Sequence, residues 1–232
     1  MAVSPGQYPR LRPAGDQGLL VEFGDSVDVA VSERVLAFDA ALRARPFAGF
    51  TESVPSYAAV LVGYDPLEVA PCAVRAHLEA LLAEPHPPLA AAALHELPVC
   101  YEQPFAPDLA EVAERCGMSE EAVIAAHLSG AYRVFMFGFA PGYGYLGGVP
   151  DAIRVPRKPN PVRARLPGSV LIAGSMCLVT TVTAPTGWWV LGRSPARIVD
   201  MNRERQFLFE VGDQIRFRRI GRAEYDALES AP

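Results

Sequence analysis

Residues 138–148, GFAPGYGYLGG, combine residue types that suit a ligand site. The glycines let the backbone adopt positive φ values and approach a ligand closely, while Tyr143 and Tyr145 offer flat faces and hydroxyl groups. A purely structural turn rarely needs five glycines and two tyrosines within eleven residues. We therefore expect a site loop here, with a structural turn as the alternative.

The same loop contains Gly142-x-Gly144-x-x-Gly147, which matches the spacing of a dinucleotide-binding fingerprint. That fingerprint requires a helix directly after the glycines, because the N-terminus of the helix holds the pyrophosphate. Here the chain continues with Gly148-Val-Pro-Asp, which cannot open such a helix promptly. We therefore exclude a dinucleotide-binding site of this kind.

A run of cations without any acid follows within twelve residues: Arg154, Arg157, Lys158, Arg163 and Arg165. A close pair of such charges repels by ~1 kcal/mol even in water. An anion, a substrate carboxylate or an acidic partner surface would relieve this repulsion. The alternative is a solvated loop whose charged heads extend into water. Arg157 is the best candidate for binding an anion, because the neighbouring Pro156 restricts the backbone conformation of this segment.

His127 is expected in the last turn of a helix, shortly before a β-rich region. A protonated histidine there is stabilised by the helix dipole and can donate to the last carbonyls. The functional alternative makes His127 a proton carrier or a substrate contact near the glycine loop. Both interpretations stay open.

The pair Trp188-Trp189 is expected to begin a strand, where successive side chains point to opposite faces. One ring then belongs to a core, and the other faces a groove or a partner. Ser169 and Ser175 flank another expected strand, but neither has a neighbouring base and no G-x-S-x-G elbow is present. We therefore do not expect a serine hydrolase, and no general base is assigned.

The elements of the first half follow the order strand, helix, strand, strand, helix, strand. This is the ferredoxin-like split βαβ pattern. The expected ranges are 18–23, 31–42, 50–54, 57–62, a helix starting at Pro71, and 94–99. Residues 84–88, EPHPP, would form a stiff extended connector, so we place a domain boundary there. The expected domains are residues 1–90 and 91–232.

The second half begins with two expected helices, one capped by Asp108 and ended by Gly117, the next capped by Ser119 and ended by Gly130. Short β-rich runs follow, separated by glycine and proline, which favours a small closed barrel. These runs are 132–139, 169–173, 178–182, 188–191, 207–211 and 214–217. The expected fold class is therefore α+β, with an N-terminal α/β domain before a β-barrel.

Composition narrows the function classes. The chain has 232 residues and a net charge of −5, so it should not attract nucleic acid as a whole. Its four cysteines have no short spacing, which argues against zinc patterns and a disulfide framework, and we expect no bound metal. Neither a signal peptide nor a membrane-spanning run is recognisable, so a cytoplasmic location is expected.

Several segments, in order along almost the whole chain, resemble one family: the bacterial proteins called allophanate hydrolase subunit 1, the B subunit of 5-oxoprolinase, or sporulation kinase inhibitor. These segments are GDQGLLVEFGD (15–25), LPVCYEQPFAPDLAEVA (97–113), GFAPGYGYLGG (138–148), PRKPNPVRARLPGSV (156–170) and GWWVLGRSP (187–195). The chain departs from the family at Met176-Cys177, where a Gln-Thr pair is common. That departure bears on substrate identity.

The resemblance implies an N-terminal α/β domain and a C-terminal cyclophilin-like β-barrel, which agrees with the ferredoxin-like pattern expected from the element order. It also implies an ATP-dependent amidohydrolase complex that cleaves a small lactam or amide, as when 5-oxo-L-proline is opened to L-glutamate. ATP is used either on this chain or elsewhere in the complex. The implied partners are a second cyclophilin-like subunit, of the type of allophanate hydrolase subunit 2 or the 5-oxoprolinase C subunit, and a lactam-utilisation-type protein.

By resemblance, the substrate-binding candidates are His127, Phe139, Pro141, Gly142, Tyr145, Pro156, Arg157, Arg163, Gly168, Ser169 and Arg193. An alternative function of another class is a regulatory binding module, such as an inhibitor of a histidine kinase. A peptidyl-prolyl isomerase activity does not follow, because the cyclophilin resemblance is one of fold alone.

Overall fold

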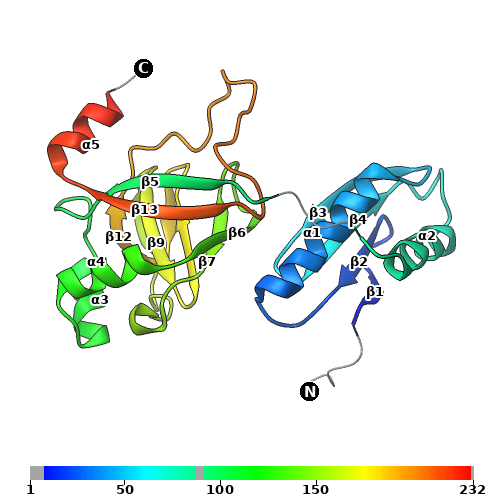
Figure 1. The fold of residues 1–232 in the computed structure, drawn as a ribbon, viewed down its shortest axis with the longest axis horizontal. Coiled ribbons are helices and arrows are strands. Elements are labelled where there is room, and N and C mark those ends of the chain that lie inside the picture. The colour runs from blue at the N-terminus through cyan, green and yellow to red at the C-terminus, as the bar shows by residue number, and fades with distance from the viewer. Residues whose placement is uncertain (1–7, 87–90, 231–232) are drawn as a thin grey trace. The chain divides into compact units, whose positions relative to one another are not determined.

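The computed structural model describes residues 8–86 and 91–230, and the chain forms two units, Met1–Ala91 and Ala92–Pro232 (Figure 1). Each unit is built around its own large hydrophobic core. Pro87 and Pro88 of the expected connector lie outside the described residues. Within the described ranges no helix has the length and apolar character needed to cross a membrane.

The first unit is a four-stranded antiparallel sheet with two helices. Its elements are β1 (Arg10–Pro13), β2 (Gly18–Glu22), α1 (Val29–Ala44), β3 (Phe50–Pro55), β4 (Ala59–Tyr64) and α2 (Pro71–Ala83). The strand order is β1-β2-β4-β3. Apolar residues of both helices pack against Val21, Val60 and Val62 on one face of the sheet. Because side chains alternate along a strand, the residues between them face away from the helices.

The expectation that residues 94–99 complete this sheet is wrong. The strand forms as β5 (Leu94–Cys100), but it belongs to the barrel of the second unit, where it runs parallel to β13 (Gln214–Ile220) along its whole length. Leu97 and Val99 are buried in the barrel core. The position beside β2 is taken by β1, a strand that the sequence pattern did not reveal. The full ferredoxin-like pattern is therefore not formed by the expected six elements.

The second unit is a closed barrel with the strand order β10-β7-β6-β13-β5-β12-β9. Its other strands are β6 (Tyr132–Phe137), β7 (Gly144–Gly147), β9 (Ser169–Ala173), β10 (Met176–Val179) and β12 (Trp189–Arg193). A separate two-stranded ribbon pairs β8 (Val162–Arg165) with β11 (Ala184–Thr186). The barrel expected from the punctuated β-rich runs is confirmed.

The expected strand at 207–211 does not form, because only an isolated bridge joins Val199 to Phe207. The helical elements are α3 (Leu109–Cys116), α4 (Glu120–Ser129), the 3-10 turn η1 (Asp151–Ile153) and α5 (Arg222–Glu229). Ser119 caps α4 by accepting from the Ala122 N–H, and left-handed Gly117 ends α3, as expected. Asp108 precedes α3 but makes no capping hydrogen bond.

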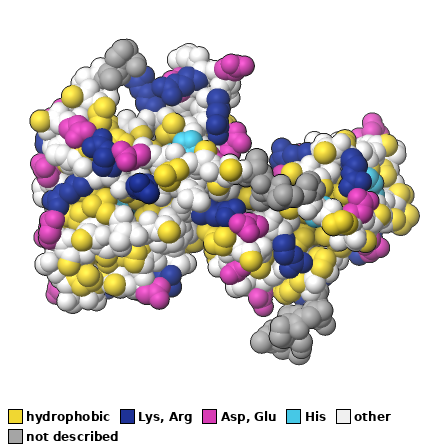
Figure 2. Space-filling model, in the orientation of Figure 1, with side chains coloured by type: hydrophobic (Ala, Val, Ile, Leu, Met, Phe, Trp, Pro, Cys, Tyr) yellow, Lys and Arg dark blue, Asp and Glu magenta, His cyan; other side chains and the backbone are white. Residues whose placement is uncertain are grey.

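Charged side chains of both signs are interspersed over the face of the molecule seen in Figure 2. The ion pairs of the chain include exposed ones, such as those of Arg218 with Glu96 and Glu224. Exposed pairs of this kind each contribute roughly 0–1 kcal/mol, so the two cores carry most of the stability.

Candidate functional site

The glycine loop joins two antiparallel strands of the barrel, β6 and β7. It lies in a strand–loop–strand setting, which confirms that the G-x-G-x-x-G spacing is not a dinucleotide fingerprint. Gly142 has a φ of 75°, and a Cβ there would meet Val199 Cγ2 at 2.3 Å, so the loop backbone packs directly against its neighbours. Thr181 Oγ1 donates to the Pro141 carbonyl at 2.6 Å and helps to hold the loop in place.

Phe139 is the exposed tip of this loop. Its φ is 70°, a left-handed conformation that a bulky residue adopts only under local strain, and its side chain is 75% exposed. A hollow of about 490 Å³ beside it is lined by Phe137, Gly138, Phe139, Ala140, Pro141, Gly142 and Phe207. The loop therefore presents an apolar, open surface at its tip.

Tyr145 of β7, the strand that follows the glycine loop, and Arg157 of the cationic run both contact Trp188. The Tyr145 ring lies 6.0 Å from the Trp188 ring at an interplanar angle of 68°, and the Arg157 guanidinium lies 5.6 Å from the same indole. Trp188 is only 7% exposed and belongs to a small cluster with Tyr143, Leu171 and other residues, separate from the barrel core. We name Tyr145, Arg157, Met176 and Trp188 the Trp188 cluster.

Tyr143 connects the Trp188 cluster to the loop tip, because its ring also lies 5.2 Å from that of Phe139. Burial raises the pKa of Tyr143, so its hydroxyl stays protonated at neutral pH and remains a hydrogen-bond donor. Met176 packs against the same residues. The departure from the family pattern at this position therefore places a thioether where the family often has a glutamine.

The cationic run contains no acid, but three of its cations pair with carboxylates from elsewhere in this chain, so their charge needs no external anion. Arg154 pairs with Asp151 at 2.7 Å. Lys158 and Arg165 both approach Asp108 Oδ1, at 2.7 and 3.5 Å. The acids come from outside the run, so sequence spacing could not reveal them. Arg163 is exposed on β8.

Arg157 differs from the other members of the run. It is exposed, and within residues 8–86 and 91–230 neither Arg157 nor Arg163 forms an ion pair. Arg157 is instead oriented by the face of Trp188. An arginine held on an aromatic face keeps its donors available for a planar carboxylate. Arg157 is thus the cation of the run best placed to receive an anion.

His127 lies inside the barrel and not beside the glycine loop. Its ring is fully buried, stacks on Phe217 at 4.7 Å, and its Nδ1 lies 2.8 Å from the Tyr101 hydroxyl. Burial lowers the pKa of His127 to about 3. The interpretation as a protonated helix-terminal histidine is therefore wrong. Its Nε2 faces Cys177 Sγ at 3.7 Å, so the second departure from the family pattern also lies in the barrel interior.

The burial of His127 predicts a specific pH dependence. An unfolded histidine has a pKa near 6.5, so the unfolded chain binds a proton that the folded chain refuses until about pH 3. The contribution of the uncharged His127 to the free energy of unfolding is fully present above pH 6.5 and is lost as the pH falls. We expect the free energy of unfolding to fall by about 1.4 kcal/mol per pH unit between about pH 6 and 4, measured by urea titration.

In a His127→Gln variant this slope should disappear, while His77→Gln should keep it. An unchanged slope in His127→Gln would contradict the assignment.

Asp213 affects stability in a lower pH range than His127. Burial alone would raise the pKa of Asp213, but hydrogen bonds from the Glu210 and Ala93 N–H groups and from His95 lower it overall. Its stabilisation is therefore lost only as the pH falls below about 4.

The remaining predicted residues are not part of the Trp188 cluster. Arg193 packs over Phe105 and Tyr225, beside α5, and its Nε donates to the Pro167 carbonyl at 3.0 Å. Ser169 Oγ donates to the Leu166 carbonyl at 2.8 Å. Gly168 has a φ of 82°, and a Cβ there would meet the Ser194 carbonyl oxygen at 2.3 Å. These groups hold the turn before β9 in place.

Pro156 contributes through its backbone, because its carbonyl accepts from Trp189 Nε1 at 2.7 Å. That bond anchors the segment carrying Arg157 to the barrel core, where Trp189 is buried. The two tryptophans therefore do face opposite sides of the barrel wall, as expected. Trp188, however, is covered by neighbours of its own and does not line an empty groove.

Comparison with known proteins places the chain in a well-defined group. It matches the carboxyltransferase domain, subdomains C and D, over residues 9–209. It is 34% identical to the B subunit of 5-oxoprolinase from Bacillus subtilis, over 94% of this chain and 95% of the relative. It is 38% identical to the corresponding 5-oxoprolinase subunit of Escherichia coli O157:H7, over 53% of this chain and 56% of the relative.

Two solved structures extend the comparison. The protein TTHA0988 is 34% identical with a TM-score of 0.79, over 88% of this chain and 40% of that longer chain. The urea amidolyase of Kluyveromyces lactis has a TM-score of 0.78 at 18% identity, over 98% of this chain and 16% of the enzyme. The latter similarity shows a shared fold. Both chains are much longer than this one.

Proposed function

This chain belongs to the family of allophanate hydrolase subunit 1 and the 5-oxoprolinase B subunit, and on that premise we propose that it serves in an ATP-dependent amidohydrolase complex. The proposed reaction is the opening of 5-oxo-L-proline to L-glutamate. One water adds to the lactam carbonyl and the ring C–N bond breaks, which leaves a free carboxylate and a free amine. A second water is consumed as ATP is converted to ADP and phosphate. ATP is taken up by the complex, and no ATP site is assigned to this chain.

The observation that carries the proposal is the meeting of Tyr145 and Arg157 on Trp188. 5-Oxoproline is a small flat ring with one carboxylate. Arg157 would pair with the carboxylate through two parallel hydrogen bonds, and the partly buried Tyr145 ring would pack against the lactam ring. The lactam carbonyl would then lie toward the glycine loop. The N–H groups of Gly138, Ala140, Tyr143 and Gly144 already donate within the loop, so a remaining backbone N–H, such as that of Gly142, would stabilise negative charge on its oxygen.

In this proposal, the chain by itself does not form a complete catalytic centre. Two candidate acid–base groups, His127 and Cys177, are fully buried in the barrel, where burial lowers the pKa of the histidine and raises that of the thiol. Neither suits proton transfer to a substrate outside the barrel. We therefore propose that the general base and the ATP chemistry come from partner subunits, namely a second cyclophilin-like subunit and a lactam-utilisation-type protein.

The test is ATP-dependent release of glutamate from 5-oxoproline by this chain co-expressed with its two partner subunits. Arg157→Ala should lower kcat/KM by about 10- to 100-fold, mainly through KM, since a hydrogen-bonded charge pair contributes about 1.5–3 kcal/mol. Arg157→Lys should recover part of the loss. The unfolding midpoint should stay unchanged, because Arg157 is exposed.

Arg203→Ala is the matched control, since Arg203 is an exposed arginine that pairs with Asp200, and full activity is expected. Wild-type turnover with an unaffected Arg157→Ala variant would remove Arg157 from the binding site. Absence of turnover in the complete mixture, together with binding to a histidine kinase, would instead support the regulatory function and overturn the enzymatic one.

A further inference from the structure

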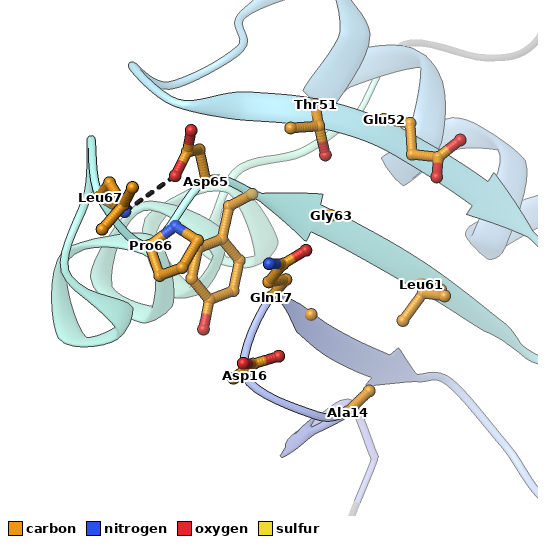
Figure 3. A pocket seen from close by; sticks show the side chains of 12 residues that line it. Ala14, Asp16, Gln17, Thr51, Glu52, Leu61, Gly63, Asp65, Pro66 and Leu67 are labelled. Carbon is orange, nitrogen blue, oxygen red and sulfur yellow. Dashed lines mark hydrogen bonds between the residues drawn. The ribbon is translucent and has the colours of Figure 1, made fainter.

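The first unit contains a second hollow, which the proposed function does not use (Figure 3). Its volume is about 490 Å³, and it lies on the sheet face that points away from α1 and α2. The lining comes from the turn between β1 and β2, from Gly18 at the start of β2, from Thr51 and Glu52 of β3, and from β4 with the turn after it.

Two paired glycines line this hollow, and neighbouring atoms pack closely over both of them. Gly18 and Gly63 are direct partners in the β2–β4 register. A Cβ on Gly63 would come within 2.5 Å of Thr51 Oγ1, and one on Gly18 within 2.7 Å of the Ala14 carbonyl oxygen. The register shifts between Phe50 and Glu52, so Thr51 and Glu52 both reach the same hollow.

The charge of the lining has one sign. It includes Asp16, Glu52 and Asp65 but neither lysine nor arginine. Asp65 is engaged locally, since its Oδ1 accepts from the Leu67 N–H at 2.8 Å. Across the described part of the chain, no ion pair involves Asp16 or Glu52. By contrast, Glu22 on the same sheet face is paired with Arg10 and Arg12 of β1.

An apolar row lies next to the hollow. Leu20 pairs with Leu61, and Leu61 pairs with Val54, so three aliphatic side chains cross the sheet side by side. Leu61 is 39% exposed and belongs both to this row and to the wall of the hollow. The row extends the surface beyond the size of a small molecule. A macromolecular partner therefore fits this face better than a free amine.

We propose that this face docks a protein partner that inserts an arginine side chain into the hollow, against Leu61. The aliphatic stem of an arginine matches Leu61, and its guanidinium matches the carboxylates of Asp16 and Glu52. The amide of Gln17 and the hydroxyl of Thr51 add neutral hydrogen-bonding groups at the same rim. The chain itself has a net charge of −5, which favours a basic partner surface.

The experiment titrates the isotope-labelled full chain with the peptide acetyl-Val-Arg-Val-amide and follows backbone amide shifts by NMR. We expect saturable shifts at Gly18, Thr51 and Gly63, weakened by added salt. The matched peptide with citrulline, which is isosteric but uncharged, should bind about fivefold more weakly, the upper range for an exposed ion pair. Glu52→Gln should weaken the arginine peptide by a similar factor.

Glu68→Gln is the control variant, since Glu68 is exposed on the same unit and does not line the hollow. Equal binding of the arginine and citrulline peptides would overturn the proposal, because the carboxylates would then play no part. Shifts confined to the second unit, or no saturable shifts up to the solubility limit of the peptide, would overturn it as well. None of these outcomes depends on whether 5-oxoproline is turned over.

Discussion

Replacing Trp189 by alanine is expected to lower the free energy of unfolding of the barrel by about 3–5 kcal/mol, the range for removing a large aromatic side chain from a core. Trp189 is among the largest fully buried side chains and packs in the main barrel core. The substitution also removes the hydrogen bond from Nε1 to the Pro156 carbonyl. The guanidinium of Arg115 and the ammonium of Lys158 lose their aromatic partner too.

Guanidinium chloride unfolding followed by far-UV circular dichroism checks this prediction, since the removed tryptophan cannot serve as the probe. Trp188→Ala should cost less, because Trp188 belongs to the smaller outer cluster, where Arg157 and Tyr145 can close over the gap. Phe139→Ala should change stability by less than about 0.5 kcal/mol, since its ring is exposed. A loss for Trp189→Ala no larger than that for Phe139→Ala would contradict the core assignment.

Asp108→Ala is expected to destabilise the barrel by about 3–5 kcal/mol, because it leaves cations without their buried partner. The Asp108 carboxylate accepts from the Val190 N–H at 2.8 Å and pairs with Lys158 at 2.7 Å and Arg165 at 3.5 Å. The Lys158 side chain is only 9% exposed, so water cannot replace the lost carboxylate fully. Asp108 therefore links the start of α3 to the cationic run and to β12.

Asp108→Asn separates the two parts of the effect, because it keeps an acceptor for the Val190 N–H but removes the charge. Its loss of stability should be smaller than that of Asp108→Ala and still measurable in a denaturant titration. Asp151→Ala is the matched control: its carboxylate pairs with Arg154 but is 85% exposed, and a change below about 1 kcal/mol is expected. If Asp108→Ala behaved like Asp151→Ala, the buried pairing would be of no energetic consequence.

Asp108 also links stability to the proposed site. Lys158 is the neighbour of Arg157, and its backbone N–H donates to the Gly187 carbonyl at 2.7 Å, directly before Trp188. The carboxylate thus holds the segment that places Arg157 over the indole. Sequence reasoning assigned Asp108 only a local capping role, since its partners lie 50 and 57 residues away. No local pattern could have indicated them.

The sequence alone determined the features that depend on neighbours a few residues apart. Ser119 and Gly117 mark helix ends because capping needs only nearby backbone groups. The opposite faces of Trp188 and Trp189 follow from the two-residue period of a strand. The glycine loop was recognisable because its residues are adjacent in sequence. The residues directly after it likewise excluded a helix at that position. The family resemblance added the order of these local segments.

Only the tertiary structure decided which distant groups meet. The strand 94–100 was recognisable, but its partner β13 begins 120 residues later, and burial of Leu97 and Val99 assigns it to the barrel. The pairing of Lys158 with Asp108 and the enclosure of His127 likewise depend on long-range packing. The periodicity of apolar residues indicates which face of an element is buried. Which element packs against that face depends on the apolar surface and the charges that the complete fold removes from water.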